Sequence, residues 1–440
     1  NGRLGVRAGS RWPFTSLPEA DGKIHYIPFP FFLAYATALL KKNHKDAFLI
    51  DAIAQGIDTT GLLNEIASYR PKLIIIETST ASFENDINII KQIKTREPNT
   101  DIALCGPHAS ACAKEIMSQY PAIEYILAGE YEETLLEFVE ALEQDKELNP
   151  IAGLMFRSNG KTRLNPDRPA IHCLDDLPWP ERKDVPIYKY NDGFAGMPKP
   201  NVQMWSSRGC HYKCSFCLWP QTIYRPHHYR TRNPFDVVDE MEYLVREFNF
   251  LAVYFDDDVF NADKNHVQSI CRQIIKRKIN VPWAAMGRAD LMDNEMLLIM
   301  ADAGLYAFKY GIESADERIL QNCGKNLDLA RAREIIKQTK SLGIKVHLTF
   351  CLGLPGETRQ TADKTRQFIE QTQPDSYQLS LATAFPGTEY FKYAQEHGLL
   401  TSDQWADYDA GSKSTVKTQA LSCREIERIK IDIDNYFNAQ

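Results

Sequence analysis

Short apolar runs alternate with amphipathic stretches between residues 45 and 157, and this alternation constrains the fold more than any other feature. The runs have the length and composition of buried strands, and the stretches between them space their apolar residues as helices do. Repeated strand, helix, strand units predict an α/β domain with a doubly wound parallel sheet, covered by helices on both faces. The predicted strands are AFLID (47–51), KLIIIE (72–77), DIALC (101–105) and IEYILA (123–128).

A second alternating series begins at Asn201, after a proline-rich segment without periodicity. Helical stretches separate its candidate strands, which predicts a partial (β/α)6 barrel, open where an eight-stranded barrel would close. We therefore expect a sheet domain over 1–160, a linker over 161–200, a partial barrel over 201–390 and a helical C-terminal extension over 391–440. The barrel strands are expected in VQMWS, AVYFD, WAAMG, YAFKYG, KVHLTF and SYQLSL.

The composition is that of an ordinary globular protein, with 44% hydrophobic and 25% charged residues. A net charge of -7 argues against nonspecific nucleic-acid binding. The longest apolar run, residues 27–40, is too short to span a bilayer and contains Pro28 and Pro30. It predicts a core helix, with a membrane-facing or lipid-contacting element as the alternative. No signal peptide is visible, so we expect a cytoplasmic protein. Peripheral contact with a membrane is the alternative.

Three cysteines, Cys210, Cys214 and Cys217, have the spacing CxxxCxxC directly after the first predicted barrel strand. Closely spaced thiolates of this kind ligate iron-sulfur clusters, and three of them leave one iron open. A zinc site would need a fourth ligand, for which His211 is the only neighbour, and no second CxxC or HxxxH follows. A thioredoxin-like pair of Cys214 and Cys217 would leave Cys210 unexplained. The other seven cysteines are scattered in apolar surroundings and are expected to be inert.

The triplet resembles that of the radical S-adenosylmethionine (radical SAM) superfamily, in which three cysteines hold a 4Fe-4S cluster and SAM chelates the fourth iron. The resemblance implies Phe216 against the adenine, and Asp256 and Asp257 at the methionyl amine. It also implies contacts to SAM from Arg288 at the methionyl carboxylate, from Glu313 and Ser314 at the ribose, and from Gly353 at the adenine. Each of these residues also has a simpler interpretation. Residues 256–258 would be an exposed acidic run or a magnesium site, Arg288 a surface residue, and Glu313 and Ser314 a helix cap. These residues all follow predicted strands, where a barrel of this kind places its chemistry.

Small and polar residues follow three strands of the first predicted sheet, and parallel sheets bind ligands at that edge. Turn chemistry alone would explain each of these loops. Ahead of a radical SAM triplet, however, they resemble the cobalamin-binding domain of B12-binding radical SAM enzymes. Two features depart from that family: the DxHxxG motif is absent, which implies cobalamin without a histidine lower ligand, and no strand ends in Asn-Pro-Pro. The implied cobalamin contacts are Thr78, Ser79, Thr80, Gly106, Pro107, His108, Gly129 and Glu130.

Several motif sequences resemble those of the hopanoid-associated branch of these enzymes, which includes enzymes similar to bacteriohopanetetrol cyclitol ether synthase. These motifs are CLWPQT, HYRTR, YFDDD, LGLPGET and TSTASF. The resemblance implies cleavage of SAM to a 5'-deoxyadenosyl radical that abstracts hydrogen from an amphiphilic or lipid-linked substrate. B12-assisted rearrangement, ring contraction or C-methylation would follow, with an external electron donor such as flavodoxin or ferredoxin. The alternative is cobalamin-dependent methylation of a non-lipid small molecule or peptide.

Two other classes remain as alternatives. A tRNA methylthiotransferase would need three more cluster cysteines ahead of the barrel and a basic tail, whereas Cys105, Cys112 and Cys173 are unsuitably placed and the tail is close to neutral. A noncatalytic electron carrier would not need the motifs around Glu313 and Gly353. We therefore predict an enzyme that binds no nucleic acid and has no transmembrane segment.

Overall fold

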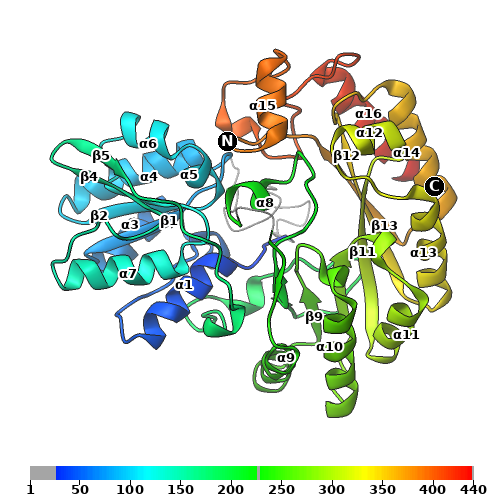
Figure 1. Cartoon of the computed structure of the whole chain (residues 1–440), viewed down its shortest axis with the longest axis horizontal. Helices are drawn as coiled ribbons and strands as arrows, with labels where there is room; N and C mark the ends of the chain where they lie inside the picture. The colour runs from blue at the N-terminus through cyan, green and yellow to red at the C-terminus, as the bar shows by residue number, and fades with distance from the viewer. Residues whose placement is uncertain (1–25, 225–227, 439–440) are drawn as a thin grey trace.

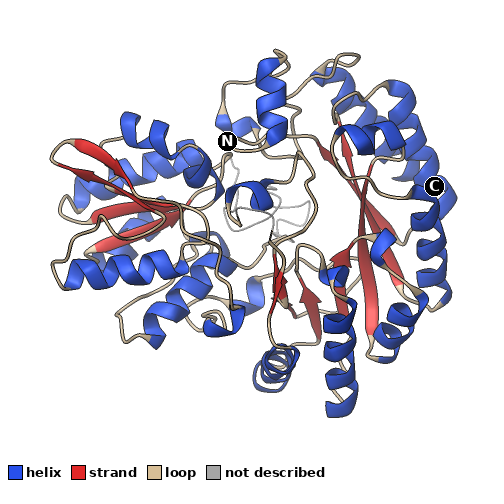
Figure 2. Cartoon of the chain, viewed as in Figure 1, coloured by secondary structure: helices blue, strands red, loops and turns tan. Residues whose placement is uncertain are grey.

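The computed structural model describes residues 26–224 and 228–438, and within them the strands form two large sheets and a two-stranded ribbon (Figure 2). The first sheet has the order β1-β2-β3-β4-β5. Its parallel strands are β1 (Leu73–Glu77), β2 (Asp101–Cys105) and β3 (Tyr125–Leu127), and an antiparallel hairpin of β4 (Leu154–Ser158) and β5 (Lys161–Leu164) extends it. This hairpin runs across residue 160, and sequence reasoning did not predict it.

Helices cover both faces of the first sheet, as the alternating pattern predicts. One face packs against α3 (Thr59–Tyr69), α4 (Phe83–Arg96) and α6 (Ala113–Gln119). The other packs against α1 (Phe31–Lys42) and α7 (Glu132–Glu143). The short helices α2 (Ala52–Gln55) and α5 (Pro107–Ala111) complete this part of the chain.

The predicted strand over 47–51 is wrong: this segment is an extended loop that leads into α2. Its backbone is held by side chains instead of a neighbouring strand, because Leu49 N donates to Asp184 Oδ2 at 3.0 Å. Asp51 then accepts from Ala54 N and caps α2. Side-chain capping offers the backbone an alternative to a sheet ladder, and the apolar composition of the run could not reveal it.

The apolar run over 27–40 is a core element, as predicted, and the alternative membrane-facing role is wrong. Most of α1 is buried, with Phe31 and Phe32 each 1% exposed. Phe31 stacks on Trp205 with ring centroids 4.1 Å apart, so the helix packs against the start of the second domain. Within the described ranges, no helix has both the length and the apolar character needed to cross a bilayer.

The second sheet is parallel throughout and confirms the predicted partial barrel. Among the described residues it has six strands in the order β13-β12-β11-β10-β9-β6. Each overlaps its predicted segment: β6 (Asn201–Met204), β9 (Ala252–Phe255), β10 (Trp283–Gly287), β11 (Leu305–Glu313), β12 (Lys345–Leu352) and β13 (Ser376–Leu381). The strands are not closed into a ring, since β6 and β13 are the two edges (Figure 1).

Helices cover the outer face of this sheet and enclose the largest apolar core. They are α9 (Pro234–Phe248), α10 (Lys264–Arg277), α11 (Asn294–Asp302), α13 (Leu329–Ser341) and α14 (Arg359–Thr372), with α12 (Glu317–Asn322) between β11 and α13. The C-terminal part contributes α15 (Glu389–Glu396) and α16 (Cys423–Asn438), and α16 packs beside β13 and α14. β7 (Ser207–Arg208) and β8 (Arg230–Thr231) pair as a two-stranded ribbon. The chain between them forms α8 (Leu218–Thr222), which lies between the two large sheets (Figure 1).

Candidate active site

The three cysteines lie in the loop between β7 and α8, directly beyond the carboxyl end of β6. Gly209 opens this loop with a φ of 89°, and a Cβ at this position would lie 1.6 Å from the carbonyl oxygen of His228. Only glycine fits such a close backbone approach. The backbone N–H of Gly209 donates to Asp258 Oδ2 at 2.9 Å, which ties the cluster loop to the end of β9.

Several other backbone contacts hold the cysteine loop in place. Gln221 on α8 donates to the carbonyl oxygens of Cys214, Ser215 and Cys217 at 3.2, 3.1 and 2.6 Å. Ser215 N donates to Cys323 O at 2.8 Å, so the turn after α12 packs on the loop from the other side. Gln221 thus supports the cysteine loop from the stretch that follows it; Arg225, Pro226 and His227 in the same stretch lie outside the described residues.

The thiols face two cations. The pKa of Cys214 is lowered to about 7 by a hydrogen bond with the Cys217 thiol and by the charges of Lys325 and Arg288, which together outweigh the effect of burial. Burial raises the pKa of Cys210 to about 12. Nearby cations stabilise thiolates, which are the form that binds iron. Three thiols on one loop, opposite two cations, fit the donor set of a 4Fe-4S cluster with one open iron.

The geometry does not fit the zinc alternative. Across residues 26–224 and 228–438, no three His, Cys, Asp or Glu side chains converge on a position for one metal ion. A zinc site needs such convergence, whereas a cluster does not, because each cysteine binds a different iron atom.

The acidic run after β9 has a largely structural arrangement. Asp257 is fully buried and accepts hydrogen bonds from Ser206 N and Ser206 Oγ, the latter at 2.8 Å, and from the hydroxyl of Ser207. With Asp258 on Gly209, two of the three carboxylates anchor the loop that carries the cysteines. Asp256 is half-buried beside them at the carboxyl end of β9, the edge where the methionyl group of SAM is expected.

Arg288 follows β10 and is 4% exposed. Its guanidinium makes a bidentate pair with Asp290, with N–O distances of 3.0 and 2.7 Å, and lies 3.7 Å over the ring of Tyr212 in the cysteine loop. Asn261 fixes its backbone by accepting from Arg288 N and donating to Arg288 O. Arg288 is therefore held rigidly beside the cluster loop, where a carboxylate of SAM would come within its reach.

Glu313 ends β11 at a bulge, with a φ of 68°, and forms a buried ion pair with Lys325 at 2.9 Å. Burial acts against the charge on Lys325, but Glu313 and Cys214 raise the pKa of this lysine above its usual value. Ser314 is also buried, and its hydroxyl accepts from Asp316 N at 3.2 Å at the start of α12. The predicted ribose residues thus lie at the carboxyl end of β11, next to the cation that faces the cysteines.

Phe216 belongs to an apolar cluster that also contains Cys214, Leu354 and Tyr390. Gly353 follows β12 and directly precedes Leu354, with a φ of 92°, and its carbonyl accepts from Tyr390 Oη at 2.9 Å. Its N–H donates to Glu357 at 3.1 Å. Phe216 is 6% exposed in this cluster, which provides the apolar surface that an adenine ring would contact.

In the first domain, the predicted cobalamin residues all lie at the carboxyl edge of β1, β2 and β3. Thr78 and Ser79 belong to a buried hydroxyl network in which Thr78 and Ser82 donate to Asp86, both at 2.7 Å. Gly106 begins α5, with Pro107 as the first helical residue, and has a φ of 93°. A Cβ at Gly106 would lie 2.8 Å from Thr78 O, so the two loops are in direct backbone contact.

His108 is 2% exposed and packs its ring against Phe83 and Trp405, with centroids at 4.5 and 5.3 Å. Its Nδ1 lies 3.2 Å from the hydroxyl of Thr80. Burial lowers the pKa of His108 to about 4, so the ring is neutral at physiological pH. The imidazole is part of the packing beneath this edge, in contact with the C-terminal part of the chain through Trp405.

Gly129 and Glu130 face the second domain. Gly129 has a φ of 76°, and a Cβ there would meet only Ile223 O, at 3.3 Å. Glu130 is 3% exposed and accepts from Arg230 at 2.7 and 2.9 Å and from Ile171 N at 2.8 Å. Its carboxylate joins the two domains, and the contacts of Gly129 and Glu130 with cobalamin stay a prediction.

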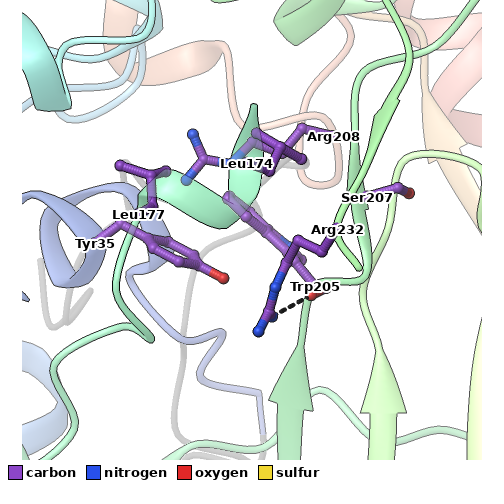
Figure 3. Close-up of a pocket in the computed structure, with 7 residues that line it drawn as sticks. All are labelled: Tyr35, Leu174, Leu177, Trp205, Ser207, Arg208 and Arg232. Atoms are coloured by element: carbon purple, nitrogen blue, oxygen red, sulfur yellow. Dashed lines mark hydrogen bonds between the residues drawn. The ribbon is translucent and has the colours of Figure 1, made fainter. Parts of the chain in front are cut away.

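Arg208 adjoins this junction and is almost fully buried (Figure 3). It pairs with Glu132 at 2.7 Å and with Glu130 at 3.5 Å, and its guanidinium lies over the rings of Tyr35 and Trp205. Figure 3 also shows Arg232 donating to Trp205 O, at 2.7 Å. The β7–β8 ribbon that leads to the cysteines is thus fixed to the first domain by buried charge pairs.

Sequence reasoning missed Lys325, Tyr212, Gln221 and Arg208. Lys325 had one usable signal, the turn Cys-Gly-Lys-Asn after a helix. Gly324 has a φ of 72°, and a Cβ there would lie 2.8 Å from Lys213 O, which shows how closely this turn approaches the cysteine loop.

Comparison with known proteins identifies both domains. Residues 206–369 match the family model of the Radical SAM superfamily, and residues 21–139 match that of the B12 binding domain. An uncharacterized methyltransferase of Pyrococcus horikoshii is 29% identical over 86% of this chain and 81% of its own length. The anaerobic magnesium-protoporphyrin IX monomethyl ester cyclase of Rubrivivax gelatinosus is 25% identical over 82% and 66%. The hopanoid C-3 methylase of Methylococcus capsulatus is 24% identical over 85% and 70%.

Solved structures share the fold. The radical S-adenosylmethionine methyltransferase TsrM from Kitasatospora setae superposes with a TM-score of 0.70 at 21% identity, covering 85% of this chain and 74% of that one. The chain is a radical SAM enzyme with an N-terminal B12-binding domain. Its cofactors are a 4Fe-4S cluster, SAM and cobalamin, which confirms the predicted class, fold and cofactor set.

Proposed function

We propose that this enzyme transfers a methyl group to a carbon atom of an amphiphilic organic substrate. The observation that carries the proposal is the packing of α5, which follows the predicted cobalamin edge of the first domain, against α8, which follows the cysteine loop. A Cβ at Gly387 would lie 2.8 Å from both Ala111 on α5 and Thr222 on α8. The two cofactor sites therefore border one region, as a shared substrate requires.

When bound, the cluster and SAM supply the 5'-deoxyadenosyl radical that abstracts the substrate hydrogen, and cobalamin supplies the methyl group. The protein contributes position and shielding. Cys210, Cys214 and Cys217 would hold the cluster, and Lys325 and Arg288 offset its negative charge. The apolar cluster around Phe216 excludes water from the space next to the SAM site, where a carbon radical must be protected.

The relatives support methylation as the reaction class. One is named a methyltransferase and another a hopanoid C-3 methylase, whose substrate class is the reason for proposing a lipid-linked or amphiphilic molecule here. Ring formation or rearrangement is the second candidate, and the cyclase from Rubrivivax gelatinosus favours it. In both candidates, the electron comes from an external donor such as flavodoxin or ferredoxin.

The test is anaerobic reconstitution with iron, sulfide and hydroxocobalamin, followed by desalting and metal analysis. About four iron atoms and one cobalt atom per chain are expected. The reconstituted enzyme is then incubated with dithionite, SAM carrying a deuterated methyl group, and either bacteriohopanetetrol or the corresponding bacteriohopane carboxylic acid. Formation of 5'-deoxyadenosine together with a deuterated methyl group on the lipid supports the proposal. Retention of iron without cobalt contradicts it, and 5'-deoxyadenosine with an unlabelled, rearranged lipid favours the second candidate.

A further inference from the structure

The inner face of the barrel sheet carries a group of polar side chains that the cluster and SAM sites do not use. Alternation along the strands places them there, because successive residues point to opposite faces. Val253, Phe255, Phe308 and Tyr310 belong to the core under the outer helices, and so do Val202, Met204, Val346 and Leu348. The residues between them therefore point inward: Gln203 on β6, Tyr254 on β9, Lys309 on β11 and His347 on β12.

Three of these inward residues, Tyr254, Lys309 and His347, lie around Phe194, which comes from the segment before β6. Lys309 Nζ lies 4.6 Å from the centroid of the Phe194 ring and 5.2 Å from that of Tyr254. The ring of His347 is 5.2 Å from that of Phe194, and Lys309 and His347 are register partners on neighbouring strands. Gln203 is the register partner of Tyr254.

Lys309 differs from the other cations of this region in its partners. Arg182, Arg208, Arg230, Arg232 and Arg288 each pair with a carboxylate. Across the part of the chain that the structure describes, Lys309 pairs with none, and its close contacts are the two aromatic faces. A partly buried cation without a counterion favours the binding of an anion.

Two neighbouring side chains have unsatisfied hydrogen-bonding groups. His347 is 7% exposed, and its Nδ1 lies 2.8 Å from Ser376 Oγ, while its Nε2 has no partner. Gln203 is 1% exposed, and both atoms of its amide lack a partner. Buried groups of this kind normally find partners, because an unsatisfied buried group destabilises the fold. Ligand oxygens would satisfy His347 Nε2 and the Gln203 amide.

We propose that Lys309, His347 and Gln203 bind an anionic group of the substrate, a carboxylate or a phosphate, on the inner face of the barrel. The inference rests on the proposed function and narrows its substrate class to amphiphiles with an acidic end. Lys309 supplies the positive charge, and His347 and Gln203 supply hydrogen bonds to the anion. The aromatic rings of Phe194 and Tyr254 provide apolar contact beside the charged group.

Binding is tested by calorimetry on the anaerobic holoenzyme with SAM bound, using octanoate, octyl phosphate and octanol as probes. We expect at least one of the two anions to bind about tenfold or more tightly than octanol. Lys309→Gln should remove this preference, and Lys309→Arg should retain most of it. Lys276→Gln, at an exposed position on α10, is the matched control and should bind like the wild type.

The comparison of the two anions shows whether the group is a carboxylate or a phosphate. His347→Phe is an independent test if Lys309→Gln does not fold. This variant should bind the anions several-fold more weakly than the wild type and bind octanol equally well. Octanol binding as tightly as both anions, or a retained preference in Lys309→Gln, overturns the inference. The same samples are assayed for 5'-deoxyadenosine after addition of dithionite. If the wild type does not cleave SAM, this result counts against the proposed function and not against the anion site.

Discussion

Among the cluster ligands, Cys214 has the most polarised surroundings, with the Cys217 thiol, Lys325 and Arg288 all acting to lower its pKa. We expect Cys214→Ala to lose the cluster and to form no 5'-deoxyadenosine above background, because two thiolates cannot hold the three irons. Iron content and product formation measure both effects. Cys173→Ala is the matched control, since this exposed cysteine lies outside the loop, and it should retain both. Cleavage of SAM by Cys214→Ala would contradict the assignment of the cluster.

Glu357, beside the predicted adenine site, gives a pH-dependent prediction. Burial raises its pKa to about 7, although the side chain accepts hydrogen bonds from Thr361 at 2.7 Å and from Gly353 N at 3.1 Å. A folded pKa above the unfolded value means that the folded state holds the proton more tightly. Protonated Glu357 therefore stabilises the fold below about pH 4.5, and this contribution is lost as the pH rises to about 7.

Glu357→Gln removes this linkage. Relative to the wild type, the variant should gain stability between about pH 4.5 and pH 7, by roughly 3 kcal/mol, and the difference should be constant above pH 7. Urea unfolding of both proteins at a series of pH values measures it. A stability difference that does not change with pH would show that the pKa of Glu357 in the folded protein is not raised above its value in the unfolded chain.

At the scale of elements, the strands of the barrel were predictable from sequence because each is a short apolar run bounded by turns. The run at 47–51 has the same composition but no strand to pair with; the N–H of Leu49 donates to Asp184 instead, and Asp51 caps α2 by accepting from Ala54 N. The cysteines were found by their spacing. Lys325, in contrast, reaches the cysteines through a turn more than 100 residues away in sequence, and only the three-dimensional packing reveals such a contact.

Glu130 was expected to contact cobalamin, and its position at the edge of the first sheet also gives it a role in joining the domains. Glu130→Ala would leave Arg230 with no carboxylate partner among the described residues and Arg208 with only Glu132. Loss of one partner from a buried ion pair costs about 3–5 kcal/mol. We expect a loss of this size in the free energy of unfolding, measured by urea titration of the reconstituted enzyme.

Glu137→Ala is the matched control for that change. Glu137 lies on α7 in the same domain, is 48% exposed at its side chain and pairs with Arg168. An exposed ion pair contributes less than about 1 kcal/mol, so this variant should unfold almost like the wild type. Equal effects of the two substitutions would contradict the role of Glu130 in the junction, and a loss of cobalt without a loss of stability would instead favour a direct contact with cobalamin.

For the whole molecule, the close packing of α5, α8 and the loop before α15 decides whether the two cofactor sites border one region. Gly387 lies where these three elements meet, with a φ of 86°, and a Cβ there would lie 2.8 Å from Ala111 Cβ and from Thr222 Cγ2. Gly387→Ala must therefore push the first domain away from the cysteine loop. We expect less cobalt to be retained after desalting while the iron content is unchanged, because the cluster ligands belong to the second domain alone.

Gly398→Ala separates this steric effect from backbone strain. Gly398 also has a positive φ, 62°, but a Cβ there would have nothing within 4 Å. Alanine at such a position carries only the cost of the left-handed conformation, about 1 kcal/mol, and cobalt retention should match the wild type. If Gly387→Ala retains cobalt as well as Gly398→Ala does, the contact between α5 and α8 does not hold the cobalamin edge in place. The proposal that both cofactors act on one substrate would then need support from a part of the interface other than this contact.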